Sequence, residues 1–218
     1  MNAVLHLSLL AAAVSALCIV ANADSPSNSP LSKVRESIRG LETRAQSGDL
    51  LFRRQSTFLS NTVLRFDSGG TYSHVGLIRR EGDDVWVIHT VPASGASFSG
   101  GVQLDTLRSY LEGPETAAYA LFRPSEALRP AALRAADEAL RFYERRIPFD
   151  TEFRIDSSDR LYCTELVWRA YLQSGVELLT DLPANLTAVP LSPSGILLPS
   201  ALQLSPHLHL ISSERNLG

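Results

Sequence analysis

Cysteine is scarce in this sequence, since the 218 residues contain only Cys18 and Cys163. Cys18 lies within residues 1–23, which are interpreted below as a signal peptide, so the mature chain keeps one cysteine, whereas exported proteins normally pair theirs. A lone thiol in an oxidising compartment is a liability unless it is deeply buried or used. Cys163 is therefore the first candidate for a functional residue, and the alternative is a small hydrophobic side chain packed at a helix start.

An excess of charge of either sign is also missing, because 20 Lys and Arg stand against 23 Asp and Glu, a formal net charge of −3. Proteins that bind nucleic acid usually carry a basic surface. The near-neutral balance argues against nucleic acid as a partner.

Charged side chains are absent from residues 1–23, and residues 5–20 are mostly apolar. The apolar run leads to Ala21-Asn22-Ala23, the small-residue pattern that precedes signal-peptide cleavage. We therefore predict a signal peptide over residues 1–23 and an exported protein of the periplasm or cell envelope. A lipoprotein signal at Cys18 is disfavoured by the bulky Leu17. A retained membrane anchor is the alternative, although the run is short of the ~20 residues that cross a bilayer.

The rest of the chain has the length of one domain. We predict a leader and surface helix over residues 24–46 and a single catalytic domain over residues 47–218. After processing we expect no stable membrane span, and we expect a monomer.

Apolar residues follow Cys163 at the spacing of an amphipathic helix. Ser158 or Asp159 can cap the start of this helix, and Gly175 can end it. Cys163 would then lie near the first turn, where free N–H groups and the helix dipole lower the pKa of a thiol and favour the thiolate. The inward stripe of the helix consists of Leu166, Val167, Ala170 and Tyr171.

Residues 71–80 and 84–91 read as the two strands of a hairpin. A loop at Gly82-Asp83 would pair Glu81 with Asp84, and a loop one residue earlier would place His74 directly opposite His89. In either register both histidines lie on one face of the sheet, because side chains alternate along a strand. A cysteine nucleophile needs a base and a third group that orients this base. Cys163, His74 and His89 provide these three parts.

The remaining pattern predicts further helices and strands around this pair of elements. Asp105 is expected to cap a short helix that ends at residue 111. The inward stripe of a long helix from Pro130 is expected to consist of Leu133, Ala136, Leu140 and Tyr143. Residues 92–101 are expected to form a loop at one lip of a cleft. We also predict helices over residues 31–46, 58–66 and 130–146, strands over 50–54, 102–104 and 116–122, and a covering loop over 176–206.

Four short motifs carry a resemblance to a known family. They are residues 48–52 (GDLLF), 72–76 (YSHVG), 148–153 (PFDTEF) and 162–167 (YCTELV). In this order they resemble the permuted papain-like cysteine hydrolases, and more narrowly the YiiX/YebB-like branch of the NlpC superfamily. The resemblance covers residues 48–171.

The resemblance implies an α+β fold with a circularly permuted papain-like core, in which the cysteine helix packs against a small antiparallel sheet. It implies that Cys163 is the nucleophile, His74 the base and His89 the third residue, with Tyr72 as a candidate substrate contact. The third position in this branch is often Glu, which would hold an imidazolium by its charge. His89 departs from that pattern, because a neutral imidazole orients the base only by hydrogen bonding.

The sequence thus predicts an exported cysteine amidase or peptidase-type hydrolase that forms a thioester acyl-enzyme and needs no cofactor. Its expected partner is a peptide or acyl-amide substrate derived from the cell wall or from lipid. Three alternatives stay open: a lipid acyl hydrolase or acyltransferase, a binding module with an inert cysteine, and a zinc site made by Cys163, His74 and His89.

Overall fold

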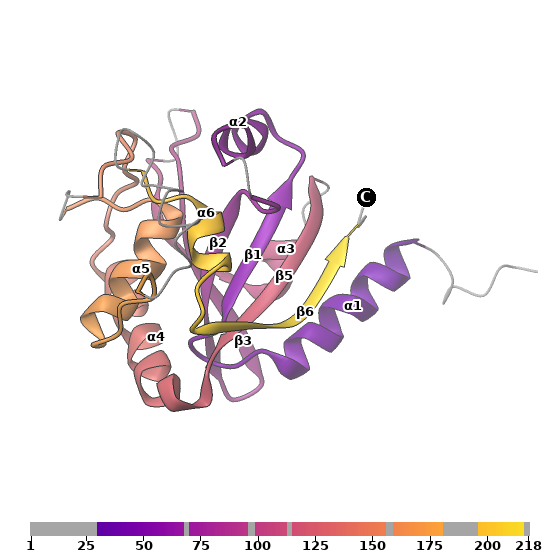
Figure 1. Ribbon diagram of the computed structural model, residues 1–218. Coiled ribbons are helices and arrows are strands. Elements are labelled where there is room, and N and C mark those ends of the chain that lie inside the picture. The colour runs from indigo at the N-terminus through magenta and orange to yellow at the C-terminus, as the bar shows by residue number, and fades with distance from the viewer. Residues whose placement is uncertain are drawn as a thin grey trace, which may run out of the picture.

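The computed structural model describes residues 30–67, 70–95, 99–112, 115–155, 159–180 and 196–215. The predicted signal peptide and most of the predicted leader lie outside these residues. One antiparallel sheet of six strands, in the order β4-β3-β2-β1-β5-β6, forms the centre of the molecule (Figure 1). The strands are β1 (Leu50–Gln55), β2 (His74–Glu81), β3 (Asp84–Val91), β4 (Gly101–Thr106), β5 (Thr116–Pro124) and β6 (Leu208–Arg215).

Helices cover both faces of this sheet, as Figure 1 shows. The fold is thus the α+β arrangement that the sequence predicted, with a cysteine helix against an antiparallel sheet. The helices are α1 (Pro30–Arg44), α2 (Phe58–Phe66), α3 (Leu107–Leu111), α4 (Arg129–Glu144), α5 (Cys163–Gln173) and α6 (Pro199–Gln203), with a short 3-10 helix η2 (Glu126–Leu128) before α4.

Side chains of opposite parity along each strand build two separate cores. On one face α1 and α3 pack through Ile38, Leu41 and Tyr110 against the odd-numbered Leu51 of β1. On the other face α4 and α5 pack against the even-numbered Phe52 and its neighbours. The buried stripe of α5 is the predicted one, with Leu166, Val167, Ala170 and Tyr171 all at or near 0% exposure.

The predicted inward stripe of α4 is only half right. Leu133 is 45% exposed and Tyr143 is 36% exposed, whereas Ala132, Ala135 and Ala139 are buried. The small alanine face lets α4 approach the sheet and the turn before β1 closely: an added Cβ on Gly48 would lie 2.5 Å from the carbonyl oxygen of Ala132. Of the predicted stripe, Ala136 is buried as expected, whereas the larger Leu133 and Tyr143 face outward.

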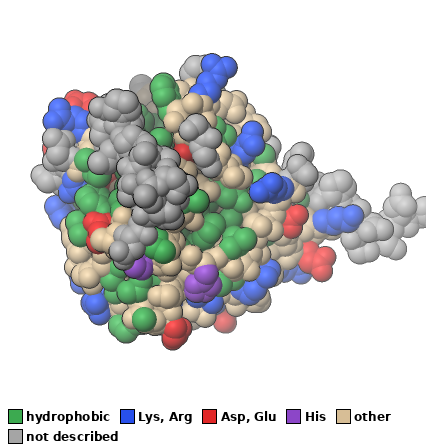
Figure 2. Space-filling model, in the orientation of Figure 1, with side chains coloured by type: hydrophobic (Ala, Val, Ile, Leu, Met, Phe, Trp, Pro, Cys, Tyr) green, Lys and Arg blue, Asp and Glu red, His purple; other side chains and the backbone are tan. Residues whose placement is uncertain are grey.

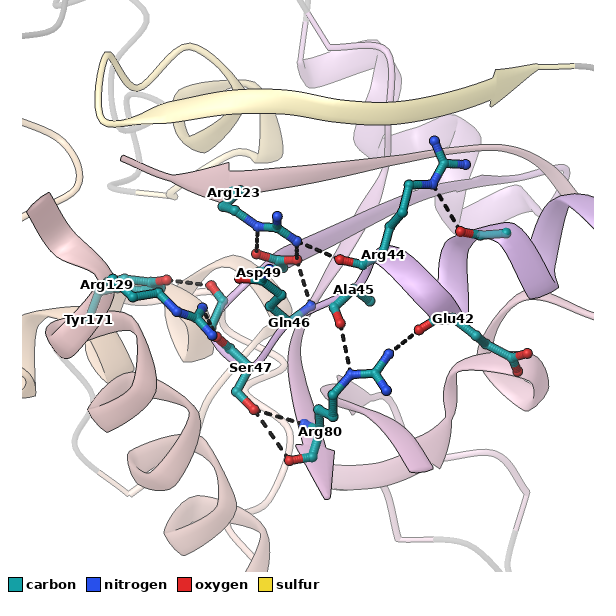
Figure 3. A network of polar contacts seen from close by, with 12 residues as sticks. Glu42, Arg44, Ala45, Gln46, Ser47, Asp49, Arg80, Arg123, Arg129 and Tyr171 are labelled. Atoms are coloured by element: carbon teal, nitrogen blue, oxygen red, sulfur yellow. Dashed lines mark hydrogen bonds and ion pairs between the residues drawn. The ribbon is translucent and has the colours of Figure 1, made fainter. Parts of the chain in front are cut away.

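The turn before β1 is fastened to several elements by a polar network (Figure 3). Asp49 is fully buried, and both of its carboxylate oxygens accept hydrogen bonds from Arg123 of β5, at 2.9 and 2.8 Å. Arg129 of α4 donates to the carbonyl oxygen of Ser47 at 2.8 Å, and the hydroxyl of Tyr171 in α5 donates to the carbonyl oxygen of Gly48. The network therefore fixes the far end of the cysteine helix relative to the sheet.

Charges of both signs are interspersed on the face seen in Figure 2. None of the helices within the described residues is long and apolar enough to cross a membrane. The longest of them, α4, has 16 residues and carries several charged side chains.

Candidate active site

Cys163 is the first residue of α5. The helix begins later than predicted, so Asp159 does not cap it, and Ser158 lies outside the described residues. The reason is that Leu161 forms a bridge with Phe149, in which the Leu161 N–H donates to the carbonyl oxygen of Pro148 at 3.1 Å. The chain stays extended through Tyr162, with φ −104° and ψ 172°, and turns into the helix at the cysteine itself.

The sulfur of Cys163 lies among hydrogen-bond donors in a residue that is only partly exposed. Thr164 Oγ1 is 3.7 Å from Sγ, and backbone N–H groups of Val75, Thr164 and Cys163 favour the charged form. Burial outweighs them and raises the pKa of the Cys163 thiol. The expectation of a thiolate in the resting protein is therefore wrong: the helix start is present, but desolvation of the charge is the larger effect.

The two histidines meet as the hairpin parity predicted. Glu81 pairs with Asp84, which selects the loop at Gly82-Asp83 from the two registers considered. The ring nitrogen Nε2 of His74 lies 3.0 Å from Nδ1 of His89, and the two rings are nearly perpendicular. His89 is buried, at 1% exposure, whereas His74 is partly exposed.

Asp105 is a site residue that the sequence analysis assigned to another role. Its Oδ2 lies 2.9 Å from Nε2 of His89. Thr106, not Asp105, caps α3 by accepting a hydrogen bond from the N–H of Ser109 at 3.0 Å. The pairing of β3 with β4 is the feature that brings Asp105 to His89. Gln103 stands opposite His89, and Asp105, two positions further along β4, points to the same face.

The carboxylate of Asp105 determines which ring nitrogens of His89 and His74 carry a proton. An ionised carboxylate only accepts, so Nε2 of neutral His89 carries the proton and its Nδ1 is an acceptor. The Nε2–H of His74 then donates to that Nδ1. The remaining nitrogen of His74, Nδ1, keeps its lone pair and is the nitrogen that can take a proton.

Tyr110 and Arg53 surround the histidine pair. The ring of Tyr110 stacks on His74, with centroids 5.9 Å apart, and lies edge-on to His89 at 4.9 Å. The guanidinium of Arg53 is 4.0 Å above the same tyrosine ring.

Burial, followed by the charge of Arg53, lowers the pKa of His74 well below its usual value of 6.5. Burial also lowers the pKa of His89, and Asp105 opposes that shift. The resting site therefore contains neutral imidazoles.

Cys163 and His74 lie in the wall of one cleft. No hydrogen bond joins the sulfur of Cys163 to a ring nitrogen of His74 among the described residues. Tyr72 is not brought to this cleft: it is 5% exposed, packs near Phe52 and donates its hydroxyl hydrogen to the carbonyl oxygen of Tyr119 at 3.4 Å.

The described residues contain no group of three or more His, Cys, Asp and Glu side chains placed to hold a metal ion. His89 in particular already uses both ring nitrogens, one toward His74 and one toward Asp105. Nor do His207 and His209 form such a group, and His207 instead bonds the hydroxyl of Thr180 at 3.1 Å.

Comparison with known proteins places this chain in a family. The model of a family described as permuted papain-like amidase enzyme, YaeF/YiiX, C92 family, matches residues 44–192. Among solved structures, the crystal structure of metalloprotein yiiX from Escherichia coli O157:H7 is similar in fold, with a TM-score of 0.61 and 22% identity over 79% of this chain and 99% of that chain. Among curated proteins, none matches.

The family match spans most of the chain and includes the strands of His74, His89 and Asp105 and the helix of Cys163. The structural likeness, at its low identity, shows the fold alone. This protein thus belongs to the permuted papain-like amidase family C92 and is a cysteine hydrolase of the amidase type.

Proposed function

We propose that this protein hydrolyses an amide bond through a thioester acyl-enzyme, with Cys163 as the nucleophile and His74 as the general base. One observation carries the proposal. The thiol lies at the start of a helix, in the same cleft as His74. Nε2 of this histidine is hydrogen-bonded to His89, and His89 is hydrogen-bonded to Asp105.

In the first step Nδ1 of His74 takes the thiol proton while Sγ attacks the carbonyl carbon of the substrate. The negative charge that develops on the carbonyl oxygen is favoured near the start of α5, where the first N–H groups have no acceptor within the helix. His74 then gives its proton to the leaving amine, and the C–N bond breaks. A water molecule, deprotonated by His74, hydrolyses the thioester and restores the thiol.

His89 and Asp105 act through His74 in this proposal. When His74 becomes an imidazolium, its Nε2–H still points at Nδ1 of His89, and the negative charge of Asp105 stands at the far side of His89. Asp105 thus supplies the charge that a neutral third residue lacks. His89 orients the ring of His74, and the carboxylate of Asp105 stabilises the protonated state of the two histidines.

We propose a peptide or a related acyl-amide as the substrate, derived from the cell wall or from lipid, and an exported enzyme. The proposal of export is based only on the sequence pattern of residues 1–23. A lipid acyl hydrolase or acyltransferase is the second candidate, and the apolar wall of the cleft favours it. An inert binding module is the third, and reactivity of the thiol separates it from the other two.

The acyl-enzyme is the species that tests the proposal. Purified protein is exposed to an envelope extract, quenched in acid and digested, and the peptide that contains Cys163 is examined by mass spectrometry. We expect an added acyl mass that hydroxylamine removes, since thioesters are cleaved by this nucleophile. The mass of the adduct identifies the acyl donor.

Two variants serve as controls for this experiment. Cys163→Ser should carry no hydroxylamine-labile adduct, and His74→Ala should accumulate it much more slowly because the thiol loses its base. An equal amount of adduct in His74→Ala would show that the cysteine reacts without the proposed base. If wild-type protein carries no adduct after exposure to the extract, the inert binding module is favoured.

A further inference from the structure

The cleft beside Cys163 has two apolar walls. Leu59 and Val63 form one wall from α2, where they stand four residues apart and share a face of the helix. Phe149, Phe153 and Tyr162 form the other. Thr57 fixes the start of α2 by accepting a hydrogen bond from the N–H of Ser60 at 3.1 Å, so the first wall has a defined position.

Ring contacts connect the members of the aromatic wall. The rings of Phe149 and Phe153 meet edge to face at 5.8 Å, and Phe153 and Tyr162 lie 5.5 Å apart. Phe153 has a φ of 54°, which is unfavourable for a bulky residue. Asp150 holds this turn by accepting hydrogen bonds from the N–H groups of Glu152, at 2.9 Å, and Arg154, at 2.6 Å.

Charged side chains are absent from the described residues that line this cleft. Its polar members are neutral, and two of them, Ser60 and Ser73, bond each other through their hydroxyls. Thr90 is fully buried, and its hydroxyl has no partner among the described residues. A carboxylate or ammonium group that entered here would lose water without forming an ion pair with a residue of the cleft wall.

The cleft is also small, at about 70 Å³. Pockets for complete drug-sized ligands usually measure ≈ 300–1,000 Å³. The space next to the cysteine therefore fits one side chain or a short alkyl end, and the rest of a substrate must lie outside it.

We propose that the cleft is the binding site for the acyl side of the substrate, and that it selects an uncharged apolar group of the size of one amino-acid side chain or a short alkyl chain. The proposal rests on Cys163 being the nucleophile and narrows the substrate class of that site. It disfavours donors that bear a carboxylate or an ammonium group close to the scissile carbonyl.

Binding to the Cys163→Ala variant tests this selectivity without any need for turnover. Three amides of equal chain length serve as probes: hexanamide is neutral, adipic acid monoamide is anionic, and 6-aminohexanamide is cationic. Their dissociation constants are measured by titration followed in amide NMR spectra. We expect hexanamide to bind at least about tenfold more tightly than either charged probe. Equal or tighter binding of a charged probe would overturn the proposal.

A charge placed in the apolar wall should change the preference. In Cys163→Ala/Val63→Lys we expect weaker binding of hexanamide and stronger binding of the anionic probe, because the new ammonium group pairs with the carboxylate. Cys163→Ala/Leu133→Lys is the matched control, since Leu133 is exposed on α4 and does not line the cleft. The control should keep the original preference, and an identical response of both variants would place the probes elsewhere.

Cys163→Ala/Phe153→Ala provides a second test if lysine at position 63 prevents folding. Loss of the ring should weaken hexanamide binding several-fold, and unchanged affinity would contradict the assigned wall.

Turnover by wild-type protein is measured separately on the N-methyl amides of the same three acids. If hexanamide is preferred in binding but no amide is cleaved, the proposed hydrolysis fails and the apolar site stands. If all three are cleaved equally, the hydrolysis stands and the selectivity fails.

Discussion

Asp105 Oδ2 lies 2.9 Å from Nε2 of His89, and this contact connects an aspartate on β4 with the histidine pair of the hairpin. A histidine in the third position of a cysteine hydrolase orients the base but brings no charge of its own. The carboxylate behind it brings that charge and fixes the tautomers of both rings. In the proposed mechanism, Asp105 on the next strand thus takes the place of the Glu that the resemblance implies.

We first predict the effect of Asp105→Asn. The amide can still accept from Nε2 of His89, so the orientation persists, but the negative charge is lost. We expect kcat to fall about 10–100-fold, the range for removal of groups that orient a functional residue. Because Asp105 raises the pKa of His89, the acid limb of the pH–rate profile should also move to lower pH.

Asp83→Asn, in the exposed hairpin turn, is the control for this experiment and should retain wild-type kinetics. A purely structural role of Asp105 would change stability but leave the position of the acid limb unaltered. A profile with an unmoved limb would therefore contradict the assignment.

The second prediction concerns the reactivity of Cys163. Burial raises the pKa of this thiol above its usual value of 9.0 and lowers that of His74 below 6.5. The thiol is thus protonated, and the imidazole neutral, throughout the range between. We expect the rate of iodoacetamide alkylation to keep rising beyond pH 9, while kcat/KM stays level across neutral pH because His74 removes the proton during attack.

Stopped alkylation reactions analysed by mass spectrometry give the pH at which half of the maximal rate is reached. A midpoint below neutral pH would show a resting thiolate, and would restore the expectation drawn from the helix start alone. Denatured protein provides the reference for a thiol in water.

The third prediction concerns the buried pair of Asp49 and Arg123 in Figure 3. Asp49→Asn leaves the guanidinium of Arg123, which is 18% exposed, without its carboxylate. Breaking such a pair by removal of one partner typically costs about 3–5 kcal/mol in the free energy of unfolding. Urea denaturation measures this loss. Asp137→Asn, which removes an exposed partner of Arg79, should stay within about 0.5 kcal/mol of wild type.

Glu165 gives the fourth prediction. Burial raises its pKa to about 7, and the guanidinium of Arg169, 2.7 Å away, opposes the shift. The unfolded chain titrates near 4.5, so between these values the folded protein holds the proton more strongly than the unfolded chain. The free energy of unfolding should therefore decrease as the pH rises from about 4.5 to 7, by roughly 3 kcal/mol at most.

Urea denaturation at pH ~5 and ~8 measures this slope. Glu165→Gln does not titrate and should be less sensitive to pH than wild type by that amount. Glu81→Gln, at an exposed position, is the control and should keep the wild-type slope. If wild type and Glu165→Gln lose the same stability over this range, another group causes the dependence.

The fifth prediction is cleavage after Ala23. Export should give a mature protein that starts at Asp24 and lacks Cys18, leaving Cys163 as its only thiol. N-terminal sequencing of the exported protein checks this result. An intact Met1, or a lipid attached to Cys18, in the envelope fraction would contradict it.

The sequence alone determined the features that depend on local periodicity. The alternation of the hairpin fixed that His74 and His89 share a face, whichever of the two loops formed. The helical spacing after Cys163 fixed the buried side of α5. Both hold because the side-chain direction within one strand or helix repeats with a period that no tertiary contact needs to supply.

Only the tertiary structure decided the features that depend on distant segments. Asp105 reaches His89 because β4 pairs with β3, and α5 starts at Cys163 because Leu161 is bridged to Phe149. The protonation state of the thiol was decided in the same way. The helix start that favours a thiolate is encoded locally, but burial, which favours the thiol, is produced by the whole fold and is the stronger of the two effects.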